Sequence, residues 1–143
     1  MPIEAEIESA ESKIEEKDSE IEDAENKLEE ANTKLEAITQ KIGELSEDQE
    51  VAGSLEGSKQ EAQSEVEASQ QKIEQIRSEL EDVSQNLELA EQTNEDSSSK
   101  IEELESLGVD VSEGRGIIEE RKNKITELKN KLNQQLSRLD QKR

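Results

Sequence analysis

The stretch AGSLEGS, residues 52–58, places two glycines and two serines in the middle of a long run of regularly spaced apolar residues. Glycine is a poor helix former and gives the backbone the freedom that a chain reversal needs. On both sides of this stretch the apolar residues recur at alternating spacings of three and four, which is typical of coiled-coil helices. We therefore predict the tip of a long helical hairpin at residues 53–58, with Gly53, Leu55 and Gly57 in the turn.

The composition narrows the fold class. The 143 residues carry a net charge of -21 and include no Phe, Tyr, Trp, His or Cys. With no aromatic residues and only 28% hydrophobic ones, a compact globular core is difficult to build. Disordered chains share this composition, but they do not keep a regular apolar period. Composition and period together predict an all-α protein made of long amphipathic helices.

The two halves of the hairpin can be paired through their heptads. The first half has large residues at position a, namely Ile7, Ile14, Ile21, Leu28, Leu35 and Ile42. An antiparallel fold at Leu55 brings together residues whose numbers add to about 111, so that every Ala or Ser faces a larger aliphatic residue. This register also places Lys17 opposite Asn94. We interpret the two as a polar layer that fixes the register, in preference to a ligand site.

Signals near residue 108 predict the end of the hairpin and the start of a third helix. Gly108 is well placed as the left-handed residue that ends a helix in a Schellman motif. Asp110, followed by Glu113 three residues later, is typical of a capping box at the start of the next helix. We predict a hairpin over residues 1–107 and a C-terminal helix within residues 108–143, both in one domain.

The third helix, expected at about 111–141, differs in charge from the hairpin. Residues 1–107 hold 33 acidic and 9 basic side chains, whereas residues 108–143 hold 6 acidic and 9 basic ones. We expect this helix to dock on the base of the hairpin, parallel to the first helix. If it does not dock, its apolar face is the best candidate for binding a partner; that face contains Ile118, Ile125, Leu128, Leu132 and Leu139.

The sequence contains no recognisable catalytic or cofactor motif. Without His, Cys or Tyr, the commonest general bases, thiol nucleophiles and imidazole ligands are missing. Pairs of carboxylates at helical spacing, such as Glu4 with Glu8, are expected to form solvated faces because no pocket surrounds them. No phosphate-binding or calcium-binding loop is present. We predict a protein that is not an enzyme, with no catalytic residues, cofactor, metal or small-molecule substrate.

The charge and the N-terminal sequence bear on partners and location. A strongly acidic surface is a poor match for nucleic acid, and no segment is apolar enough to insert into a membrane. The start of the chain lacks the basic and apolar regions of a cleavable signal peptide. We expect a soluble protein, either cytoplasmic or exported with a partner, that forms homo- or hetero-oligomers by helix packing.

Leu55-Glu56-Gly57 resembles the Trp-x-Gly or Leu-x-Gly turn of helical-hairpin proteins and toxin-targeting domains in the type VII secretion pathway. The resemblance covers three residues and implies a helical accessory or targeting subunit for a secretion system or a secreted toxin. The export signal of that pathway contains Tyr, which this chain lacks, so the resemblance implies export only together with a partner.

The function expected from the sequence is that of a coiled-coil structural or adaptor protein. Two alternatives stay open: the secretion accessory subunit, and an acidic phage-type scaffolding protein with a basic C-terminal helix. All three would act through protein–protein interaction.

Overall fold

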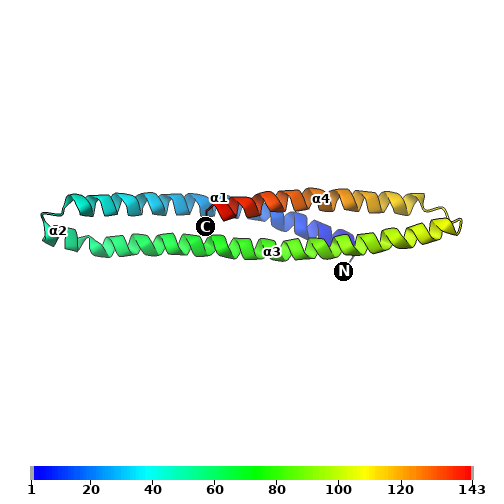
Figure 1. Ribbon diagram of the computed structural model, residues 1–143, viewed down its shortest axis with the longest axis horizontal. Coiled ribbons are helices and arrows are strands. Elements are labelled where there is room, and N and C mark those ends of the chain that lie inside the picture. The colour runs from blue at the N-terminus through cyan, green and yellow to red at the C-terminus, as the bar shows by residue number, and fades with distance from the viewer. Residues whose placement is uncertain (1, 143) are drawn as a thin grey trace.

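The computed structural model describes residues 2–142, which form an all-α structure, as the sequence predicts. Its helices are α1 (Ile3–Glu44), α2 (Gln49–Ser54), α3 (Glu56–Ser106) and α4 (Ser112–Gln141). Helices α1 and α3 run antiparallel, and α4 returns along α3 in the same direction as α1 (Figure 1). None of the helices in this part of the chain is long and apolar enough to cross a lipid bilayer.

The hairpin reverses earlier than the glycine-rich stretch predicts. Helix α1 ends at Glu44, and the chain turns through residues 45–48 before the short helix α2 begins. The side chain of Asp48 caps α2 by accepting a hydrogen bond of 3.2 Å from the backbone N–H of Val51. A polar run, residues 46–48, thus closes one helix and opens the next.

The predicted tip at residues 53–58 is therefore wrong in its position. Gly53 lies in α2 and Gly57 lies in α3, and neither has a positive φ. Leu55 keeps a helical backbone, with φ -96° and ψ -6°, and marks only the junction between α2 and α3. The Leu55-Glu56-Gly57 sequence consequently lies beside the reversal, on the α3 side of it.

The pairing of α1 with α3 is displaced from the predicted register by about two heptads. Lys34 forms an ion pair with Glu65 at 3.3 Å, and Lys17 forms one with Glu79. The residue numbers of these pairs add to 99 and 96, compared with the expected 111. A shift of two heptads exchanges one a or d residue for another, so the apolar seam is preserved.

The core is thickest where all three long helices meet. We call this section the base; it comprises residues 3–25 of α1, 77–94 of α3 and 118–141 of α4. Side chains of the base that are at most 1% exposed come from all three helices, namely Ile14, Ile21, Leu80, Leu87, Ala90, Ile125, Leu128, Leu132 and Leu139. Burying a large aliphatic side chain contributes about 1.5–3 kcal/mol, so this section supplies most of the stabilisation of the fold.

The connection from α3 to α4 contains the predicted helix end. Gly108 has a φ of 86°, and the N–H of Val109 bonds to the carbonyl oxygen of Leu104 at 3.2 Å. The N–H of Gly108 bonds to the carbonyl of Glu105 at 3.0 Å, which completes a Schellman motif. The start of α4 differs from the expected capping box, because the Asp110 carboxylate accepts from both the N–H and the hydroxyl of Ser112.

The long helices α1, α3 and α4 lie side by side only in the middle of the molecule (Figure 1). At one end, residues 26–76 of α1, α2 and α3 form a section that lies for the most part beyond the C-terminal end of α4 (Figure 1); we call it the arm. Near the C-terminal end of α4, Arg138 bonds to Glu25 and Asp140 bonds to Arg77. At the other end, α3 and the start of α4 extend beyond the beginning of α1, where Arg115 pairs with Glu105 at 2.7 Å.

Candidate protein-interaction surfaces

The structure separates the two residues that the sequence predicts as one polar layer. The Lys17 ammonium pairs with Glu20 at 2.6 Å and with Glu79, and its side chain is only 13% exposed. Burial alone would lower the pKa of Lys17, but the bonds to Glu20 and Glu79 raise the pKa above its ordinary value. The bond from Lys17 also lowers the pKa of Glu79. Lys17 is therefore held as a charged group at the edge of the α1–α3 seam.

Asn94 has a different role from the predicted one. Its side chain is 4% exposed, and its amide nitrogen donates a hydrogen bond of 3.0 Å to the backbone carbonyl of Ile118. This bond ties α3 to α4, near the point where α1 begins. Asn94 therefore contributes to positioning the third helix and does not pair with Lys17.

The apolar face of α4 is used within the chain. Ile125, Leu128, Leu132 and Leu139 are at most 1% exposed and belong to the base, while Ile118 is half-buried. The expectation that α4 docks on the hairpin is correct, and four of the five residues considered as a partner-binding face are not accessible to a partner.

Gln135 is a buried polar residue that the sequence analysis missed. It is 3% exposed, and its amide nitrogen donates to the carbonyl of Ile14 at 2.8 Å and to Asp18 Oδ1 at 2.6 Å. The signal that could have identified it is its spacing, because it lies three residues after Leu132 and four before Leu139 in the 3,4 pattern of α4. Gln135 links α4 to α1 as Asn94 links α4 to α3.

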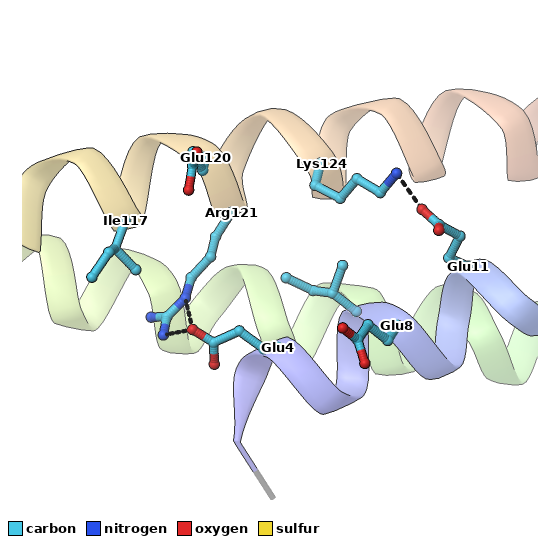
Figure 2. A pocket seen from close by; sticks show the side chains of 8 residues that line it. Glu4, Glu8, Glu11, Ile117, Glu120, Arg121 and Lys124 are labelled. Carbon is cyan, nitrogen blue, oxygen red and sulfur yellow. Dashed lines mark hydrogen bonds and ion pairs between the residues drawn. The ribbon is translucent and has the colours of Figure 1, made fainter.

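A shallow groove of about 410 Å³ lies between the first turns of α1 and the first half of α4 (Figure 2). Arg121 crosses it to Glu4, with Nε 3.0 Å from the Glu4 carboxylate, and Lys124 crosses it to Glu11. The hydrogen bond from Arg121 lowers the pKa of Glu4, and the bond that Lys124 donates to Glu11 raises the pKa of Lys124. Ile7 and Ile117 supply its apolar lining.

This groove has no features of an active site. The charged groups across it are already paired with each other, and its other polar lining residues are the carboxylates Glu8 and Glu120. Over residues 2–142, no group of three or more His, Cys, Asp or Glu side chains is arranged to hold a metal ion. The arrangement orients α4 on α1, and we assign the groove to that role.

The arm exposes seam residues that the base would bury. Leu35, Ile38 and Ile42 of α1 are half-buried, as are Leu55 at the α2–α3 junction and Val66 of α3. A groove of about 380 Å³ runs between the two helices there, and Ile38 and Leu55 contribute to its lining. These side chains stay partly exposed because two helices cover only part of each other's apolar stripe.

The α3–α4 end exposes apolar residues as well. Leu104 is 43% exposed, Val109 47% and Ile117 41%. Together with Leu107, which is 79% exposed, these residues lie around the turn and are interspersed with acidic side chains.

Comparisons with known proteins give no relatives of this chain: no protein-family model, no curated protein and no solved structure matches it.

Proposed function

We propose that this protein is a non-enzymatic coiled-coil structural or adaptor protein that acts by packing its arm against another protein chain. The observation that carries the proposal is the change in burial along one continuous seam. In the base, α4 covers the seam, and Ile14, Ile21 and Leu80 are at most 1% exposed. In the arm, Leu28, Ile73 and Ile76 next to the base are still buried. Toward the reversal the same heptad positions continue without a third helix, and the large aliphatic side chains of the seam are half-buried, namely Leu35, Ile38, Ile42, Leu55 and Val66.

The energetics support a binding role for the arm. Several large aliphatic side chains are partly exposed along two adjacent helices, and full burial of each contributes about 1.5–3 kcal/mol relative to full exposure. A partner that covered Leu35, Ile38, Ile42 and Val66 would complete this burial. Scattered apolar residues on a surface are ordinary, but a continuous apolar stripe marks an interaction surface.

Site-specific photocrosslinking in the native cell tests this proposal. A photoreactive amino acid at Thr39, an exposed position beside the arm seam, should give a discrete crosslinked protein product. The matched control carries the same amino acid at Glu22, an exposed position on the base. Equal labelling from the two positions, or no product from Thr39, would contradict the proposal.

A further inference from the structure

The surface on which α4 docks is marked by a column of residues at seven-residue intervals on α1. Its members are Glu4, Glu11, Asp18 and Glu25. Each bonds to a side chain of α4: Arg121, Lys124, Gln135 and Arg138, in that order. Because a heptad repeat keeps such a column on one face of a coiled coil, its next two members, Asn32 and Thr39, lie on the same face of the arm.

Helix α3 carries a matching column. At seven-residue intervals this column contains Arg77, Ser84, Glu91, Ser98 and Glu105, and its three charged members bond to Asp140, Lys129 and Arg115 of α4. Continuing the column toward the arm at the same interval leads to Gln70 and Gln63. On α1 the column that flanks α4 changes from acidic to uncharged polar residues where α4 ends. On α3 it changes from charged residues alternating with serines to glutamines.

The uncharged columns border half-buried aliphatic side chains. Leu35 lies between Asn32 and Thr39 in sequence, and Val66 lies between Gln63 and Gln70. We call these six residues the neutral strip. Acidic side chains lie one column further out, at Glu29, Glu36, Glu67 and Glu74. The arm as a whole has 12 acidic and 5 basic residues, so the neutral strip is a local exception to its charge.

We infer that the neutral strip binds the neutral strip of a second copy of this chain across a two-fold axis. The inference rests on the proposed function and specifies the occupant of the arm. Two copies that each carry a net charge of -21 repel one another, so they associate only through a surface that brings few charges together. Two arms side by side would form a four-helix section, in which the second arm takes the place that α4 occupies in the base.

A basic helix of another protein is a weaker match for this surface. Where this chain binds a basic helix, as it does with α4, acidic residues of the flanking column meet the cations, for example Glu4 with Arg121 and Glu25 with Arg138. The flanking columns of the neutral strip provide amides and a hydroxyl instead. These groups form hydrogen bonds equally well with identical groups from a second copy.

Sedimentation of the purified full chain between roughly 1 and 100 µM tests the inference. We expect a concentration-dependent dimer that becomes tighter at higher salt, because salt screens the repulsion between the two acidic copies. The double substitution Thr39→Glu with Gln63→Glu should weaken the dimer at least about tenfold, since it places four carboxylates in one interface. Both positions are exposed in the single chain, so helicity should not change.

The matched control is Thr33→Glu with Gln71→Glu. It adds the same charge at exposed positions of the same two helices, away from the neutral strip, and should leave the dimer unchanged. A chain that stays monomeric over the whole concentration range would overturn the inference, as would equal effects of the two double variants. If photocrosslinking from Thr39 then captures a different protein, the proposed function stands and only the self-association is refuted.

Discussion

Among the described residues, Gly108 is the one with a positive φ, and the turn from α3 to α4 depends on it. A Cβ at this position would meet no neighbouring atom within 4 Å, so the strain of a substitution comes from the backbone alone. We expect Gly108→Ala to lower the free energy of unfolding by about 1 kcal/mol, measured by denaturant titration with circular dichroism.

Gly116 provides the control for this prediction. It lies within α4, its φ is not positive, and a Cβ there would also meet nothing within 4 Å. Because Ala is a better helix former than Gly, Gly116→Ala should raise the free energy of unfolding by about 0.5–1 kcal/mol. If both substitutions stabilise the protein, the Schellman turn at Gly108 is not present in solution.

Lys17 and Asn94 show why polar residues at core positions were harder to place than apolar ones. The prediction assumed that a lysine in the seam needs a polar residue directly opposite. A lysine side chain is long enough to carry its ammonium group to the edge of the seam, where Glu20 and Glu79 neutralise it. The amide nitrogen of Asn94 donates to a backbone carbonyl of α4, which no pairing of α1 with α3 could reveal.

At the scale of helices, α4 is the element that turns the base into a three-helix structure. Leu128 is 0% exposed at the centre of its apolar face. Leu128→Ala should therefore lower the free energy of unfolding by about 2–5 kcal/mol through lost burial and a cavity. The measurement is again denaturant unfolding, with Leu89→Ala as the control, because Leu89 is 65% exposed on α3.

The Leu89 variant should stay within about 0.5 kcal/mol of the unsubstituted chain. Comparable losses for the two variants would mean that α4 does not pack on the hairpin as the structure has it.

The existence of the helices could be predicted from the sequence more reliably than the register in which α1 pairs with α3. The 3,4 spacing correctly predicts a long hairpin, a helix end at Gly108 and a docked third helix, because these follow from local patterns. The register does not follow, because a heptad repeat leaves the seam nearly unchanged when one helix slides by seven or fourteen residues. The position of the reversal decides the register. The chain reverses at the polar residues 46–48, where Asp48 caps α2, and not at the glycines of residues 52–58.

For the whole molecule, the charge of the α1 column that flanks α4 changes along the hairpin, and we propose that the arm binds a different partner from the base. Over the base, the acidic column from Glu4 to Glu25 selects the basic helix α4 of the same chain. Over the arm, the column becomes uncharged at Asn32 and Thr39. This change from acidic to uncharged residues can be read from the sequence. Its relation to the end of α4 becomes visible only in the three-dimensional structure.

Hydrogen exchange measured by mass spectrometry at low and high protein concentration tests the central claim that two copies of this chain associate through the arm. Amide exchange slows where helices gain tertiary packing. We predict that raising the concentration slows exchange in residues 32–42 and 59–70, while residues 77–94 and 121–139 exchange at the same rate throughout. Exchange that is independent of concentration in the arm, or protection that appears only at the α3–α4 end, would contradict the account.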